Sequence, residues 1–188
     1  MLLILLLGST PVYSLDVLAL RAGVSGNLGT YSVDDPNGST DAGSGYSVTP
    51  VAVFVYSNEW RLWTEFDYKQ FTAQYSSGNV GQKVKSYSLD AIMQRGFVSS
   101  TNRYFIGGGV SFSRDSYKER SLVDQDGFIL QQYADRKEFN TALLIRAGYS
   151  RLIDDGSVGV NIGYQLPLND GIRGIRLSAY WLFWGSEK

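Results

Sequence analysis

The chain has 188 residues, of which 44% are hydrophobic, 14% aromatic and 19% charged, and its formal net charge is −1. This aromatic-rich composition excludes an intrinsically disordered chain, and the near-zero charge argues against a nucleic-acid partner. Cysteine and histidine are both absent, so the chain has no disulfide framework and no thiolate metal site. At this length we expect one domain.

The first 14 residues are typical of a signal peptide. An apolar run, Leu2 to Leu7, precedes the small-residue cleavage pattern that ends at Ser14, although no Lys or Arg comes before the run. We therefore expect a signal peptide over 1–14 and one domain over 15–188, with a buried N-terminal strand or helix as the alternative. No later stretch approaches the ~18 consecutive apolar residues of a transmembrane helix.

Eight segments alternate between apolar and polar residues with a period of two, which is typical of β-strands. In one of them, Leu143 and Ile145 lie on one face and Asn140 and Arg146 on the other. Polar connections of alternating length separate the segments, as in outer-membrane barrels, where loops are long on the outside and turns are short on the periplasmic side. The expected strands are 16–28, 46–56, 60–70, 84–97, 103–113, 139–149, 158–166 and 175–183, with long loops at 29–45, 73–83, 114–138 and 167–174.

Aromatic residues near both ends of these segments indicate a membrane. Tyr46 and Tyr56 are ten residues apart, so they point to the same side of an extended strand. Ten residues in a tilted strand rise about 25 Å, the height of the apolar band between the aromatic girdles of a transmembrane barrel. The expected girdle consists of Tyr46, Tyr56, Trp60, Tyr68, Tyr87, Phe97, Tyr104, Phe112, Phe139, Tyr149, Tyr164, Trp181 and Phe183.

Alternation alone also fits a soluble barrel of the lipocalin kind, with an apolar interior. The aromatic residues at both ends of the apolar face, the lack of charge between them and the Gly, Ser and Asn of the polar face favour the membrane alternative. We therefore predict an all-β fold, an eight-stranded antiparallel up-and-down transmembrane β-barrel. Its lipid-facing side chains include Leu18, Leu89, Val110, Leu143 and Ile162.

If the apolar face is outside, charged side chains share the lumen. An eight-stranded barrel is just wide enough for its side chains to fill it, so these charges must be paired. We expect Arg21 or Arg146 to lie within ion-pair reach of Glu65, Asp67 or Asp90, in a plug that is either a static polar core or a gate. The expected members are Arg21, Arg61, Glu65, Asp67, Lys69, Asp90, Arg146 and Arg176.

The chain resembles the small eight-stranded outer-membrane barrels of the OmpA and OmpX type. Its last strand, which includes Arg176, Ser178, Trp181 and Phe183, is similar to the C-terminal signal by which the barrel-assembly machinery recognises its clients. Ser178 stands where that signal has Gly, and the chain continues past Phe183. The resemblance implies export to the bacterial outer membrane, contact with membrane lipid and lipopolysaccharide, and a monomeric protein.

Fold alone does not give function. Histidine, the usual base of the barrel enzymes, is absent, and the acidic clusters at 34–41 and 124–127 lack the order of a calcium loop, so we expect no catalytic site, cofactor or metal. We expect a surface anchor or recognition protein that acts through its loops, or alternatively a narrow gated pore; a lipid-modifying enzyme is a distant third. The loop 114–138 is the expected contact with a protein partner, through Tyr117, Phe128, Ile129 and Tyr133.

Overall fold

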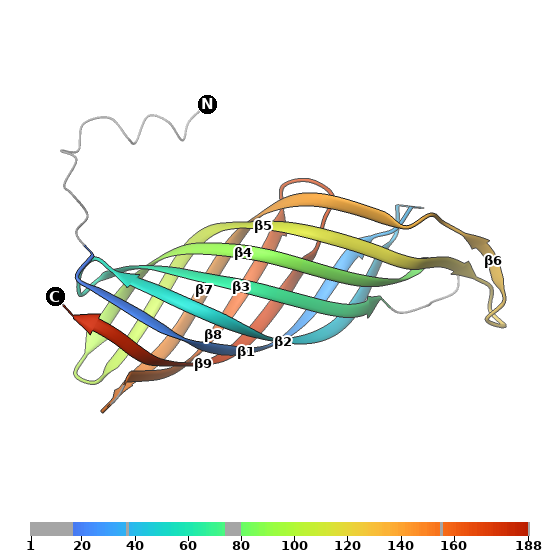
Figure 1. Cartoon of the computed structure of the whole chain (residues 1–188). Helices are drawn as coiled ribbons and strands as arrows, with labels where there is room; N and C mark the ends of the chain where they lie inside the picture. The colour runs from blue at the N-terminus through green and yellow to red at the C-terminus, as the bar shows by residue number, and fades with distance from the viewer. Residues whose placement is uncertain (1–16, 37, 74–79, 155, 188) are drawn as a thin grey trace, which may run out of the picture.

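The computed structural model describes residues 17–36, 38–73, 80–154 and 156–187, and they form one barrel of tilted antiparallel strands (Figure 1). Nine strands are present in these ranges. They are β1 (Ala19–Asp34), β2 (Thr40–Val55), β3 (Trp60–Ala73), β4 (Val80–Ser99), β5 (Asn102–Val123), β6 (Ile129–Gln132), β7 (Arg136–Ile153), β8 (Gly156–Pro167) and β9 (Arg173–Glu187). The expected signal peptide lies outside the described residues.

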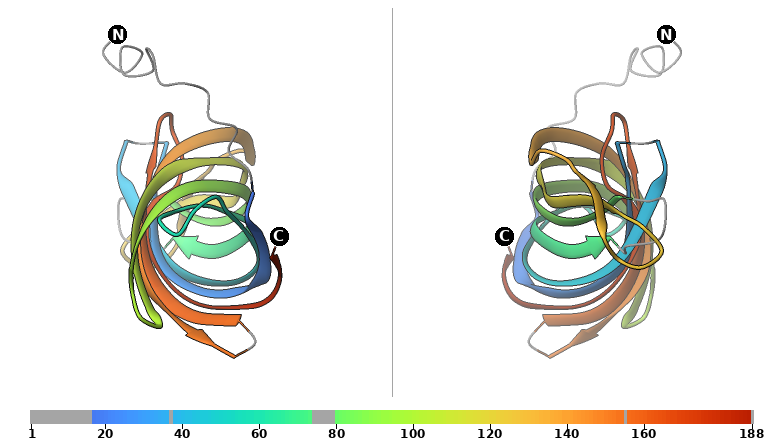
Figure 2. Two further views of the ribbon diagram at one scale, coloured as in Figure 1. Left: turned by 90° about the vertical axis from the view of Figure 1, so that its left-hand side faces the viewer. Right: turned by 90° about the vertical axis from the view of Figure 1, so that its right-hand side faces the viewer.

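Eight of these strands close the barrel. Neighbours in sequence pair antiparallel, and β9 pairs with β1 to complete the ring, which Figure 2 shows from both ends. The short strand β6 pairs with β5 beyond the ring, at the end opposite the N-terminal start of β1. The prediction of a closed eight-stranded antiparallel barrel is confirmed, and no described segment is a helix long and apolar enough to cross a membrane.

The two ends of the barrel differ. The terminal end holds the start of β1, the last residues of β9 and the short connections, whereas the hairpin end holds the β5–β6–β7 extension (Figure 1). At the terminal end, β4 and β5 are joined through residues 100–101 alone, with Ser100 at a φ of 56°. A two-residue link with positive φ fits the right-handed twist of paired strands.

The long loops were predicted too long. Two of the four expected loops, 29–45 and 114–138, consist largely of strand residues, because β1 and β2 remain paired up to Asp34 and Thr40, and β5 continues to Val123. At 73–83, β4 already begins at Val80, and residues 74–79 lie outside the described ranges; at 167–174, residues 168–172 connect β8 to β9. The aromatic residues mark the two ends of the apolar segment of each strand. Backbone pairing continues beyond this segment toward the hairpin end, where the outward side chains are polar.

The inner and outer faces are oriented as the sequence indicates. On β7, Leu143 is 43% exposed and Arg146 is 1% exposed, so the apolar side chain lies outside and the charged one inside. Leu18, Leu89 and Ile162 are also exposed on the outer face, and Val110 is half-exposed. In a strand of period two, this assignment fixes the direction of the other side chains of β7, and strand register extends it around the ring except at the bulges between Ala22 and Gly23 and between Gly81 and Lys83.

The lumen has three layers, although the sequence predicted a polar core alone. Along β3, Trp63 lies in an apolar cluster toward the terminal end and Phe71 lies in another toward the hairpin end. Glu65, Asp67 and Lys69 lie between them on the same inner face. The barrel therefore has a hydrophobic core after all, divided by a layer of charged residues.

Candidate functional site

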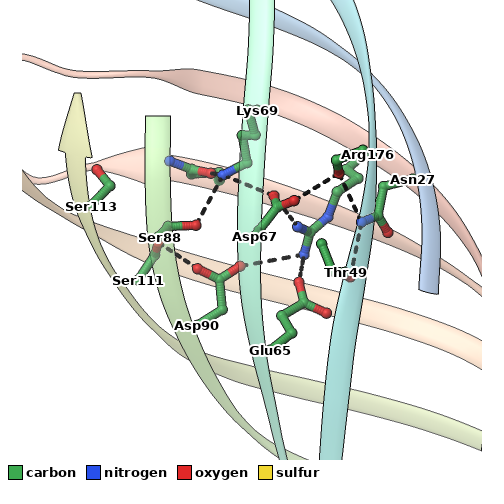
Figure 3. A network of polar contacts seen from close by, with 12 residues as sticks. Asn27, Thr49, Glu65, Asp67, Lys69, Ser88, Asp90, Ser111, Ser113 and Arg176 are labelled. Atoms are coloured by element: carbon green, nitrogen blue, oxygen red, sulfur yellow. Dashed lines mark hydrogen bonds and ion pairs between the residues drawn. The ribbon is translucent and has the colours of Figure 1, made fainter. Parts of the chain in front are cut away.

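Glu65 is the centre of the charged layer. Its carboxylate accepts two hydrogen bonds from Arg146, Nη2 to Oε1 at 2.7 Å and Nη1 to Oε2 at 3.2 Å, and a third from Trp63 Nε1 at 2.8 Å. Arg176 also contacts Oε1 (Figure 3). These bonds join β3 to β7 and β9 across the lumen, and the Arg146 contact is the arginine–acid pair expected from the sequence.

Arg176 links the three acids of the layer. Its Nη1 lies 2.9 Å from Asp67 Oδ2, and its Nη2 lies 3.5 Å from Asp90 Oδ2. Lys69 Nζ lies 3.4 Å from Asp67, so the cations Lys69, Arg146 and Arg176 form one buried network with the three acids. Figure 3 shows the part of this network around Lys69 and Arg176. Because the charges balance and each has a hydrogen-bonding partner, the desolvation penalty of burying them is offset.

Neutral side chains complete the layer. The hydroxyl of Ser111 donates to Asp90 at 2.6 Å, and that of Ser47 donates to Asp67 at 2.7 Å. Lys69 Nζ donates to Gln165 Oε1 at 3.1 Å. The acids thus keep fixed positions, because hydrogen bonds from small polar residues hold the oxygens that the arginines leave free.

Two of the expected plug residues lie outside this network. Arg61 is buried in the apolar layer, where its guanidinium lies 4.2 Å from the ring centroid of Phe105 and its Nε donates to Gln94 at 2.8 Å. Arg21 is half-buried near the start of β1, and its register partners are Val53 and Gly185. Aromatic contact and an amide therefore take the place of a carboxylate at Arg61.

The aromatic residues inside the barrel were not predicted from the sequence. Trp63 and Tyr180 meet edge to face with ring centroids 4.8 Å apart, and Phe105 lies 6.5 Å from Tyr180. Each has the same parity as charged lumen residues of its own strand. Strand parity was therefore the signal that could have placed them in the lumen.

Little space remains beside the charged network. A cavity there, lined by Lys69, Arg146 and Arg176 among others, has a volume of about 10 Å³. One ordered water needs about 10 to 15 Å³, so this space holds one water at most. At this level of the barrel the charged side chains contact one another across the lumen.

The thirteen aromatic residues expected at the girdle lie on the outer side, exposed or half-exposed. Tyr104 and Tyr149 pair across neighbouring strands near the terminal end, with ring centroids 5.3 Å apart. Tyr68 and Tyr87 pair near the other end of their strands at 4.9 Å. Aromatic side chains thus lie at both ends of the apolar outer surface.

The last strand places its four expected assembly residues alternately. Arg176 and Ser178 are buried in the lumen, and Trp181 and Phe183 lie on the outer face, with ring centroids 5.6 Å apart. This alternation agrees with the pattern in the sequence. Recognition by the assembly machinery stays a prediction.

The β5–β6–β7 extension bears an apolar tip. Phe128, Ile129 and Leu130 are 70%, 65% and 64% exposed, and Asp124 Oδ1 accepts hydrogen bonds from the backbone N–H of Asp126 and Phe128. The turn at the tip is therefore held by an Asp side chain, as in many tight turns. It presents three consecutive large apolar side chains.

Tyr117 was wrongly assigned to the exposed loop. It is 5% exposed and packs into the apolar cluster at the hairpin end, because β5 continues and position 117 keeps the inward parity of Ser113. Burial also raises the pKa of its phenol. Tyr133 is half-buried and donates its backbone N–H to the Arg120 carbonyl, whereas Phe128 and Ile129 are exposed as expected.

Comparison with solved structures identifies relatives in fold. Neisserial surface protein A is similar over 87% of this chain and 97% of its own, with a TM-score of 0.55 and 17% identity. The attachment invasion locus protein Ail of Yersinia pestis is similar over 86% of this chain and 97% of its own, with a TM-score of 0.52 and 12% identity. The likeness is one of fold. No protein-family model matches the chain, and comparison with curated proteins gives no match.

Proposed function

We propose that this protein is an integral outer-membrane barrel without a catalytic site that acts as a surface anchor or recognition protein through its hairpin end. The observation that supports this most strongly is the combination of a filled, ion-paired lumen with a projecting apolar tip. A filled lumen leaves the outer surface and the hairpin end as the regions that can contact other molecules.

The placement in a membrane follows from the inverted distribution of polarity. Charged side chains such as Glu65 and Arg146 are buried, whereas Leu89, Val160 and Ile145 are more than half exposed. A soluble protein does not expose a continuous apolar surface of this extent. In a bilayer the same surface contacts lipid, and the closed ring satisfies every strand edge.

The orientation follows from the connections. Outer-membrane barrels have short periplasmic turns and longer extracellular segments. The terminal end has short connections, such as residues 100–101, and the hairpin end bears the extension. We therefore propose that the hairpin end is extracellular.

The extension offers an edge for a protein partner. Among the described residues, β6 pairs with β5 through Ser121 to Val123, and no strand pairs with its other edge. An exposed edge with apolar side chains is a template for the addition of an extended strand. The proposed partner is therefore a protein segment that pairs with β6 and covers Phe128 or Ile129.

The test compares adhesion of bacteria that display either the wild-type protein or the triple variant Phe128→Ser, Ile129→Ser, Leu130→Ser. The host strain does not itself adhere, and the number of cells that bind to protein-coated surfaces is measured. The proposal expects adhesion above background for the wild type and its loss in the triple variant, at equal surface display.

A matched control changes an apolar outer residue within the ring, Ile145→Ser, and should keep wild-type adhesion. Equal adhesion of the wild type and the triple variant would contradict a recognition role for the tip. If less of the triple variant reaches the cell surface, adhesion is compared between cells with equal antibody staining of the displayed protein.

A further inference from the structure

The lumen near the terminal end holds cations whose ionisable neighbours are not acids. Arg61 on β3 is 4% exposed, and Arg103 is half-buried on the inner face of β5. The side chains that act most strongly on the charge of Arg61 are Tyr180, Arg103 and Arg146. Those that act on Arg103 are Arg21 and Tyr180. Within the described part of the chain, these two arginines therefore lie near other cations and without a carboxylate.

Both arginines lie beside the ring of Phe105. The guanidinium carbon of Arg61 is 4.2 Å from the ring centroid of Phe105. On the neighbouring strand, Gly96 lies opposite Phe105, and a Cβ built at Gly96 would be 3.2 Å from Arg103 Cδ. The absence of a side chain at Gly96 thus lets Arg103 lie across β4. Two like charges are brought to one level of the lumen.

Buried hydrogen-bond donors around this ring lack partners among the described residues. Arg61 Nη2 and Gln94 Nε2 have none, although Gln94 Oε1 accepts a bond from Arg61 Nε at 2.8 Å. Tyr180 Oη lies near Arg61 but makes no hydrogen bond of normal geometry. All three residues are more than nine-tenths buried. Because these groups can all donate, the group that would satisfy them is an acceptor.

An anion would satisfy both the donors and the charge. Arginine keeps its proton in proteins, so Arg61 cannot lose its charge on burial. Water would satisfy the donors and leave the positive charge without compensation. In the charged layer, by contrast, Lys69, Arg146 and Arg176 each contact an acid of the chain. The difference between the two levels indicates that negative charge at the terminal end comes from a ligand.

The cluster lies at the mouth of the lumen. Tyr104, which separates Arg103 from Phe105 in the sequence, points outward at the level of the expected girdle. Arg103 is half-buried and Arg61 is nearly fully buried, so a ligand from the terminal end reaches Arg103 first. It does so without crossing the charged layer. The orientation proposed above places this mouth in the periplasm.

We propose that Arg61 and Arg103 bind a phosphate group at the terminal mouth of the lumen, with Gln94 and Tyr180 as further donors. Guanidinium groups form strong, charge-assisted hydrogen bonds to phosphate, often in pairs. The donors come from β3, β4, β5 and β9, and β9 is opposite β4 in the ring. Donors on opposite walls suit the oxygens of a tetrahedral ion better than the single plane of a carboxylate.

The phosphate group belongs to a soluble ion or solute. Its binding groups lie inside the ring, and the pairing of β4 with β3 and β5 leaves no opening through which a lipid headgroup could enter from the bilayer. The bound phosphate is a structural ligand that stabilises the folded barrel, since any ligand that binds the folded state alone does so. The charged layer closes the lumen above it.

The test measures binding of inorganic phosphate to the purified protein in neutral detergent by isothermal titration calorimetry at constant ionic strength. The test variant is Arg103→Gln, which changes a half-buried residue. The control is Arg95→Gln, which removes an outward, half-exposed basic residue of β4 at the same end of the barrel. Heat-modifiable migration in gels verifies that each variant is folded.

The wild type and Arg95→Gln should bind phosphate with equal affinity. Arg103→Gln should bind at least about tenfold more weakly, the loss expected for one charge-assisted hydrogen bond. Phosphate should also raise the Tm of the wild type and of Arg95→Gln equally, and that of Arg103→Gln by less. A residue that only supports the fold would not change this phosphate-dependent shift in Tm.

Competing ligands identify the chemical class and the source of the phosphate. Glycerol 3-phosphate should displace inorganic phosphate, whereas acetate and phosphatidylglycerol in the micelles should not. Displacement by acetate would overturn the choice of a phosphate group, and displacement by phosphatidylglycerol would overturn the soluble source.

No binding by the wild type, unchanged affinity in Arg103→Gln, or an equal loss in Arg95→Gln would overturn the proposal. Because the readout is binding of a soluble ion in detergent, its failure leaves the adhesion test of the hairpin tip unaffected.

Discussion

The inner and outer faces of the same strands follow opposite rules. On β7, Arg146 is buried in the lumen against Glu65, while Leu143 and Ile145 face outward without a charged neighbour in their rows. The inner face tolerates charge because every charge of the network has a partner there. The apolar band of the outer face carries no charged side chain, which agrees with the proposed contact with lipid, since lipid offers a charge no partner. Removing a charge should therefore damage the inner face, and adding one should damage the outer face.

The largest effect is expected for Glu65→Ala. This change removes the acid that contacts both Arg146 and Arg176 and leaves buried positive charge without compensation. The expected cost is about 3 to 5 kcal/mol, since breaking a buried ion pair by removing one partner has a cost of that size. Unfolding by denaturant in detergent measures it.

A matched control is Ser47→Ala, which removes a neutral hydrogen bond to Asp67 in the same layer and should cost about 1 kcal/mol. If Glu65→Ala is no more damaging than Ser47→Ala, the charges of the layer do not stabilise one another as the contacts indicate. The conclusion that paired charges stabilise the inner face would then be wrong.

The second effect concerns the outer face. Leu143→Arg places a charge in the apolar band and should cost about 2 to 4 kcal/mol, the range for Arg at the midplane of an outer-membrane barrel. Unfolding of the protein reconstituted in lipid vesicles measures the cost. As a control, the conservative change Leu143→Met should leave the free energy of unfolding nearly unchanged. If Leu143→Arg also leaves it unchanged, Leu143 does not contact lipid.

The smallest effect is expected at the rim of the hairpin end, where an ion pair lies partly exposed to water. Arg173 contacts both carboxylate oxygens of Asp34 at 2.7 Å, with side chains 41% and 38% exposed. Exposed ion pairs contribute about 0 to 1 kcal/mol, so Arg173→Ala should cost less than about 1 kcal/mol, and less again at high salt. A cost as large as that of Glu65→Ala would show that the rim is as dry as the lumen.

The sequence predicted which side chains face inward and outward better than it predicted where the strands end. The parity of Leu143 and Arg146 indicated which side each occupies, because a period of two leaves two choices and the aromatic residues decide between them. The ends of β1, β2 and β5 were missed, because strand pairing continues above the apolar band without an apolar pattern on the outside. Tyr117 was misplaced for the same reason.

The contacts across the lumen were only partly predictable. The sequence indicated that arginines would meet acids, since a narrow barrel forces them together. It did not indicate that Arg176 rather than Arg21 would join Arg146 on Glu65, because strand stagger determines which residues share a level. The apolar layers at Trp63 and Phe71 were missed, because polar residues of the inner face were considered without their apolar neighbours of equal parity.

The most direct test of the central claim, that the lumen is sealed and function resides outside it, is the conductance of the purified wild-type protein in a planar lipid bilayer. We expect no reproducible channel, because charged side chains meet across the lumen and a cavity beside them has a volume of only about 10 Å³. A discrete, reproducible conductance that disappears when Glu65 or Arg176 is substituted would contradict the account and assign the network to a gate.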